Sequence, residues 1–170
     1  MSVHAVLQYL KYRLIARGRH GTHSPFVYAF VEAMGRRDSP QPATNTVSPL
    51  LSTAHGRLLN RIAYHYDYRS ILDLEHAEYF DNHTRQYDMV LFREHKPGMW
   101  LPMLHKMVFA VKKNGVIAVP GIHKSAEATA AWNNLRGHGA VRLSLDLYSI
   151  GLLFFSDDFK VKQHFVIKGG

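Results

Sequence analysis

The chain has 170 residues, of which 46% are hydrophobic and 20% are charged, and this length and composition predict one domain with a single core. It contains no cysteine, which excludes disulfides, thiol nucleophiles and thiolate metal sites. No apolar run is as long as a membrane span, and the first residues lack the pattern of a secretory signal, so we expect a cytoplasmic protein.

The net charge of +8 is concentrated in the N-terminal part of the chain. Residues 1–69 hold nine lysines and arginines and three acidic residues, whereas residues 70–170 hold twelve and ten. A basic surface of this kind indicates an anionic partner, such as nucleic acid, a lipid surface or an acidic protein. A basic face that is only solvated explains the charge equally well.

Two helices are expected in this basic part. The first carries an apolar stripe and ends at Gly18. The stripe consists of Val3, Val6, Leu7, Leu10 and Leu14. Such a helix lies on a membrane or packs on the core, and we favour packing because the stripe lacks bulky aromatic residues. Ser24 and Pro25 form an N-cap and a first helical residue, which predicts a second helix up to Met34.

Arg19, His20 and His23 lie just before this second helix, where free backbone N–H groups attract anions. We therefore name these three residues as a candidate anion site, with a solvated turn as the alternative. A linker follows at residues 35–47. The chain is accordingly divided into a basic helical segment with its linker, 1–47, and an α/β domain, 48–170.

The α/β domain alternates helical and buried-strand patterns. We expect helices at 48–63, 100–112 and 125–136 and strands at 71–74, 89–92, 116–119 and 141–145, and a final hairpin of strands 152–155 and 164–167. This order predicts a doubly wound, Rossmann-like sheet with an antiparallel end.

The strand Ile71–Leu74 leads directly into a polar loop, at the point where open α/β sheets bind their ligands. Nucleotide-type cofactors need glycine in that loop, because only a bare backbone approaches them closely. Here Glu75 and Ala77, together with His76 and Glu78, stand in the glycine positions. Asp73 places one carboxylate near the end of this strand.

Several motifs resemble class I S-adenosylmethionine-dependent methyltransferases of a group common in the Bacteroidetes. They are Lys11–Leu14, His23–Tyr28, His55–Leu59, Ser70–Leu74, Asp146–Phe155 and Lys162–Lys168. The resemblance implies a methyltransferase-type sheet in which Asp73, Glu75 and Ala77 occupy cofactor-binding positions. Two strand–helix units of the family have no room in residues 75–87, and the strand ends at Phe92 and Pro120 lack the acidic residues of the family.

Scaffold motifs are thus retained while cofactor positions are lost, and this predicts a pseudoenzyme without S-adenosylmethionine or catalysis that acts as a binding or structural module. The alternatives are an active methyltransferase with an altered pocket and a binder of nucleic acid or anionic surfaces through the basic N-terminal third. The polar loop offers five possible metal ligands, Glu75, His76, Glu78, Asp81 and His83, but without a recognised spacing, so we expect a solvated loop and no metal site.

Loss of the two units would leave Ile71–Leu74 at an edge of the sheet, where unpaired backbone groups favour pairing with another chain. We expect a homodimer formed through this edge, with coverage by residues 35–47 or 75–87 as the alternative.

Overall fold

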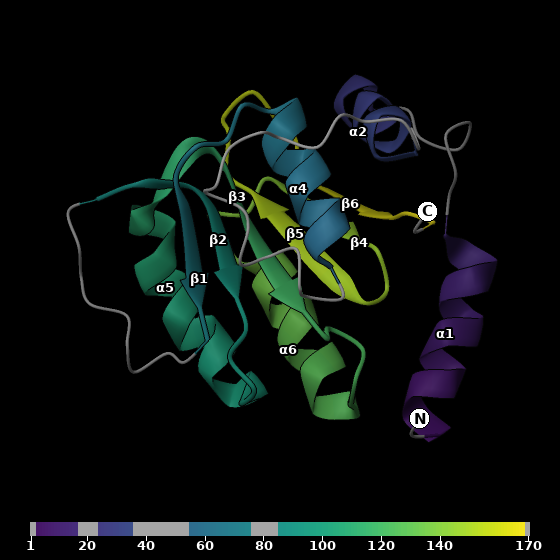
Figure 1. Ribbon diagram of the computed structural model, residues 1–170. Coiled ribbons are helices and arrows are strands. Elements are labelled where there is room, and N and C mark those ends of the chain that lie inside the picture. Colours follow the sequence, from purple (N-terminus) through teal and green to yellow (C-terminus); the bar gives the residue numbers. More distant parts are fainter. Residues whose placement is uncertain (1–2, 17–23, 36–54, 76–84, 169–170) are drawn as a thin grey trace.

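The computed structural model describes residues 3–16, 24–35, 55–75 and 85–168 of the chain (Figure 1). In chain order the elements are α1 (Val3–Ile15), α2 (Pro25–Gly35), α4 (Gly56–His65), β1 (Ile71–Leu74), β2 (Tyr87–Phe92), a 3-10 turn η4 (Pro97–Met99), α5 (Trp100–Ala110), β3 (Val111–Pro120), α6 (Ala126–Gly137), β4 (Leu143–Asp146), β5 (Ile150–Phe154) and β6 (Gln163–Val166).

The strands form one six-stranded sheet in the order β1-β2-β3-β5-β4-β6. β1, β2 and β3 are parallel, β5 runs antiparallel to both β3 and β4, and β6 is parallel to β4. The prediction of an α/β fold with a mainly parallel sheet and an antiparallel part is therefore confirmed.

The predicted final hairpin is wrong in its pairing. β5 does not pair with β6: it pairs with β4, so that Leu143 lies opposite Phe154, and β6 then adds to the other side of β4. The connection of residues 155–162 thus crosses over β4 instead of making a tight turn. The reason is the continuous burial of β4, whose residues are all buried and need a strand on each side.

Two helical layers cover the two faces of the sheet. Alternate residues of the strands point to opposite faces, as strand geometry requires. Met89 and Leu91 of β2 belong to the core under α2 and α4, and Val90 and Phe92 belong to the core over α5 and α6. The chain is therefore a three-layer α/β/α structure. The carboxyl ends of the parallel strands lie along one open side of the sheet, which we call the carboxyl edge, and their amino ends lie along the opposite side, which we call the amino edge.

The start of β3 differs from the prediction. We expected the helix over residues 100–112 to end with Lys112, but α5 ends at Ala110 and Val111 already pairs with Tyr87. Lys112 instead donates to Asp88 Oδ1 at 2.8 Å. A side chain at Gly115 would lie 2.6 Å from the Asp88 carbonyl, so glycine permits this close approach of the strands.

Helix α1 contains the predicted stripe but ends at Ile15, before the predicted end at Gly18, and its expected packing is wrong. Of the predicted stripe, Val6, Leu7, Leu10 and Leu14 are exposed, and Leu14 is 87% accessible. The helix is held instead by Tyr12, which is buried and donates its hydroxyl hydrogen to the carbonyl of Ile167. Helix α1 lies beyond the β4 and β6 end of the sheet (Figure 1). The exposed residues of its stripe leave an apolar surface in contact with solvent.

Candidate functional site

The carboxyl ends of β1 and β2 carry an ion pair. Arg93, which follows β2, donates from Nε to Asp73 Oδ1 at 2.8 Å and from Nη2 to Asp73 Oδ2 at 2.9 Å. Its third nitrogen, Nη1, lies 3.6 Å from Glu75 Oε1. The hydrogen bond to Asp73 raises the pKa of Arg93. The guanidinium thus faces two carboxylates, and together these three side chains carry one net negative charge.

The remaining predicted site residues fall outside the described part of the chain. The cofactor position Ala77 lies in the segment 76–84, as do four residues of the metal hypothesis: His76, Glu78, Asp81 and His83. The candidate anion site of Arg19, His20 and His23 lies in the segment 17–23. The structure brings Asp73 and Glu75 together around Arg93, which the sequence reasoning did not name as their partner. Within the described residues, no group of three or more histidine, aspartate or glutamate residues is placed to hold a metal ion.

A second polar cluster lies at the carboxyl ends of β3 and β4. His123 Nε2 is 2.8 Å from Asp146 Oδ2, and His123 Nδ1 is 3.1 Å from Thr129 Oγ1. His4 of α1 reaches the same Thr129 hydroxyl at 3.2 Å. Asp146 also accepts from the backbone N–H of Tyr148, which has a φ of 67°.

A histidine beside a carboxylate is also the arrangement of many proton relays, and the His123 side chain is only 11% exposed. However, both ring nitrogens of His123 contact protein groups, and Thr129 Oγ1 also donates to the Ser125 carbonyl at 3.0 Å. A small cavity of about 220 Å³ adjoins the cluster under α1. We therefore interpret the cluster as a structural one, whose hydrogen bonds hold α1 and the turn after β4 in place.

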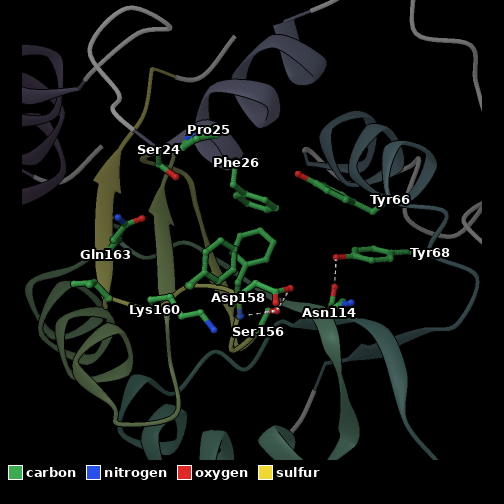
Figure 2. Close-up of a pocket in the computed structure, with 14 residues that line it drawn as sticks. Ser24, Pro25, Phe26, Tyr66, Tyr68, Asn114, Ser156, Asp158, Lys160 and Gln163 are labelled. Carbon is green, nitrogen blue, oxygen red and sulfur yellow. Dashed lines mark hydrogen bonds between the residues drawn. The ribbon is translucent and has the colours of Figure 1, made fainter.

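The larger of the two cavities described here, about 630 Å³, lies at the opposite edge of the sheet, among the amino ends of the parallel strands. It is bounded by the start of α2, the end of α4, the start of β3 and the connection between β5 and β6. Figure 2 shows Phe26 and Tyr66 on one side of it and Ser156, Asp158 and Asn114 on the other.

Aromatic rings dominate the wall of this cavity. The Phe26 and Tyr66 centroids are 5.7 Å apart at an interplanar angle of 19°, and those of Tyr66 and Tyr68 are 5.6 Å apart at 26°. Phe154 and Phe159 meet Phe26 edge-on, at 5.3 and 5.0 Å. We call this cavity the aromatic pocket and define it by these five rings.

Hydrogen bonds fix the pocket wall in place. Tyr68 donates to the carbonyl of Asn114 at 2.7 Å, and Ser156 donates to Asp158 Oδ2 at 2.9 Å. Burial raises the pKa of Tyr66, and burial followed by the charges around it raises that of Tyr68, so both phenols stay protonated at neutral pH.

The sequence reasoning missed this pocket because its rings come from four separate segments. The run of tyrosines at residues 64–68, just before a buried strand, was the one local signal of an aromatic surface there.

Comparisons with known proteins leave the family open. A scan against protein-family models, a search of curated proteins and a search of solved structures each found no match. Among the described helices, none combines the length and the apolar character of a membrane-spanning segment. The function therefore has to be inferred from the two edges of the sheet and from the surface of α1.

Proposed function

We propose that this protein is a methyltransferase-like binding module that neither binds S-adenosylmethionine nor methylates. The observation that carries the proposal is the ion pair between Arg93 and Asp73 at the carboxyl ends of β1 and β2. In the resembled family this edge holds the cofactor, and Asp73 occupies one of its binding positions. Here both oxygens of Asp73 accept from Arg93.

The residues present do not fit the cofactor. A carboxylate that accepts two parallel bonds from a guanidinium is in one of the strongest polar arrangements in proteins, and a ligand would have to break it. The half-exposed Glu75 lies beside the pair and would repel the cofactor carboxylate. Because Arg93 already faces two acidic groups, it provides no free cation to offset that repulsion.

The sheet supports the methyltransferase-like part of the proposal. The three parallel strands β1, β2 and β3, with the antiparallel β5 beside β3, agree with the order that the resemblance implies for this part of the sheet. β1 is the outermost strand on its side of the sheet, because β2 is the one described strand that pairs with it. This is expected if the two strand–helix units beyond β1 are lost. What is retained is the framework, and its carboxyl edge is closed by charged side chains.

The side-chain signal of Arg93 tests this proposal directly. In a nitrogen-15 NMR spectrum, the Nε–H of Arg93 reports its bond to Asp73, and Arg93→Lys identifies the signal by its loss. S-adenosylmethionine and S-adenosylhomocysteine should leave this signal unmoved at millimolar concentration. A saturable shift of the Arg93 signal with either molecule would show that the cofactor enters the edge, and the proposal would be wrong.

The surface of α1 favours a second candidate function, binding to anionic lipid surfaces. Leu7 and Leu10 are 61% and 55% exposed, and Lys11 and Arg13 are exposed on the same helix. Helices with exposed apolar residues and basic neighbours lie in the interface of anionic membranes. This arrangement, unlike the packed helix expected from the sequence, leaves the apolar residues available.

Sedimentation with vesicles tests this second function. The protein should co-sediment with vesicles of phosphatidylserine and phosphatidylcholine, and Leu10→Asp should abolish the binding. Val161→Asp is the matched control, because Val161 is 70% exposed and lies far from α1 in the sequence. Equal binding of both variants, or no binding by the unmodified protein at low salt, would contradict this function.

A further inference from the structure

The aromatic pocket lies outside the site discussed under the proposed function. Tyr66 and Tyr68 precede β1, and Gly115 lies where β3 begins its run beside β2, so the pocket occupies the amino edge of the parallel strands. Asp73 and Arg93 lie at the carboxyl edge. Ligand binding in the pocket is therefore independent of whether the cofactor binds.

The size of the pocket fits a small organic molecule. Ligand pockets commonly measure about 300–1,000 Å³. The volume of about 630 Å³ lies within this range. The pocket is also built on the sheet and on helix ends, since Tyr68 is tied to Asn114 and Phe26 packs against Phe154. Its walls are thus supported by the same core that holds the fold.

The rings define the shape of the guest. Aromatic pairs prefer offset stacking or edge-to-face contact with centroids about 4.5–7 Å apart. The near-parallel rings of Phe26, Tyr66 and Tyr68 form one continuous side, and the edge-on rings of Phe154 and Phe159 adjoin it. A flat ring can stack on this side and extend the existing arrangement, whereas a puckered ring cannot.

The polar lining defines the edge of the guest. Asp158 and Ser156 lie across from the rings and offer oxygen acceptors (Figure 2). Burial raises the pKa of Tyr66, so its phenol stays neutral at pH 7. Asp158 and Lys160 bring one charge of each sign to the lining, which favours a neutral guest over a charged one.

We propose that the aromatic pocket binds a neutral, flat heteroaromatic molecule, stacked on the rings of Phe26 and Tyr66 and with N–H groups directed to Asp158. A purine-like ring such as adenine has the required features: a flat face and N–H donors on one edge. In this arrangement the N–H groups on the edge of the ring donate to the Asp158 carboxylate.

Adenine is a suitable probe, and cyclohexanol is the saturated control. Titration of the full chain, followed by backbone NMR shifts, should give saturable changes at Phe26, Tyr66 and Asp158 with a millimolar or lower dissociation constant. Tyr66→Leu should weaken adenine binding by about tenfold through loss of stacking. Tyr66→Phe keeps the ring and its stacking surface and should leave the adenine affinity nearly unchanged.

Two matched controls separate the pocket from general effects. Tyr64→Leu changes a half-exposed tyrosine of the same helix outside the pocket and should leave the adenine affinity unchanged. Asp158→Ala should weaken binding, whereas Asp157→Ala, next to it and outside the lining, should not. The inference is overturned if adenine produces no saturable shifts up to its solubility limit. Equal affinity for cyclohexanol, or an equal loss of affinity in Tyr64→Leu, overturns it as well.

Discussion

Replacement of Asp88 by alanine should destabilise the fold more than any other single change of a carboxylate at the strand ends. Asp88 Oδ2 accepts from the backbone N–H groups of Arg69 and Ser70, at 3.0 and 2.8 Å, and from the Ser70 hydroxyl at 2.7 Å. Asp88 Oδ1 accepts from Lys112 at 2.8 Å. The side chain is only 15% exposed, so it joins the starts of β1, β2 and β3 in a site with little water.

The magnitude follows from two independent considerations. A hydrogen bond to a charged group contributes about 1.5–3 kcal/mol, and several such bonds on one carboxylate are not additive. Partial burial raises the pKa of Asp88, but the bonds from Lys112, Ser70 and Arg69 outweigh it and lower that pKa to about 2. A depression of this size corresponds to about 2 kcal/mol, reduced by solvent screening to about 1–2 kcal/mol. We therefore expect a loss of about 2 kcal/mol in the free energy of unfolding.

Urea unfolding at pH 7, followed by circular dichroism, measures this loss. Asp157→Ala is the control, because Asp157 and its partner Lys113 are 66% and 65% exposed, and such pairs contribute less than about 1 kcal/mol. Since the folded pKa of Asp88 is depressed, its contribution is complete above about pH 5 and is lost as the pH falls from about 4 to about 2. A loss below about 0.5 kcal/mol, or one that is equally large at pH 2, would refute this reasoning.

Two further predictions concern packing and assembly. Gly151→Ala should lower the free energy of unfolding by about 1–3 kcal/mol, because the added Cβ would lie 2.5 Å from the ring of Trp132. Gly139→Ala is the control: a Cβ there would meet nothing within 4 Å, so the free energy of unfolding should change by less than about 0.5 kcal/mol. Pairing of two β1 edges predicts the mass of a dimer in light scattering and its loss in an Ile71→Lys, Leu72→Lys double variant. A monomer at all concentrations contradicts the dimer, and a dimer that persists in the variant contradicts the β1 interface.

The buried strands were predictable because their apolar runs leave little choice of structure. Ile71–Leu74 was predicted with its exact bounds, and Met89–Phe92 and Val116–Val119 lie inside the observed strands. The helix expected at 125–136 is observed as α6, and Ser125 caps it, since its side chain accepts from the Ala128 N–H at 3.0 Å. These features depend on local chemistry, which the sequence contains.

The pairing of the strands and the exposure of the side chains were harder to predict from the sequence, because they depend on residues far apart in the chain. The position of β6 beside β4 is decided by the burial of β4 on both sides, and no local pattern marks it. The stripe of α1 has the spacing of a packed helix, yet Leu14 is largely exposed. Periodicity predicts that a face exists and does not predict what covers it.

In the candidate sites, too, single residues could be predicted from the sequence, but the partners that they meet in the fold could not. Asp73 was named as a cofactor position because of the family resemblance, but its partner Arg93 is twenty residues away and became apparent only when β1 and β2 were paired. The aromatic pocket combines residues from Phe26 to Phe159 and has no sequence motif. The anion site of Arg19, His20 and His23, and the anionic partner of the basic N-terminal third, remain predictions.

The central claim is that the carboxyl edge around Asp73 does not accept S-adenosylmethionine, and isothermal calorimetry of the purified full chain tests it most directly. The titration is carried out with the cofactor at up to about 1 mM, since weaker binding than this would be without consequence for a cofactor site. For the unmodified protein we predict heats no larger than those of dilution. We expect the same result at low salt, where electrostatic attraction is stronger. A saturable isotherm with a micromolar dissociation constant, lost in Asp73→Ala and retained in Asp157→Ala, would contradict the account.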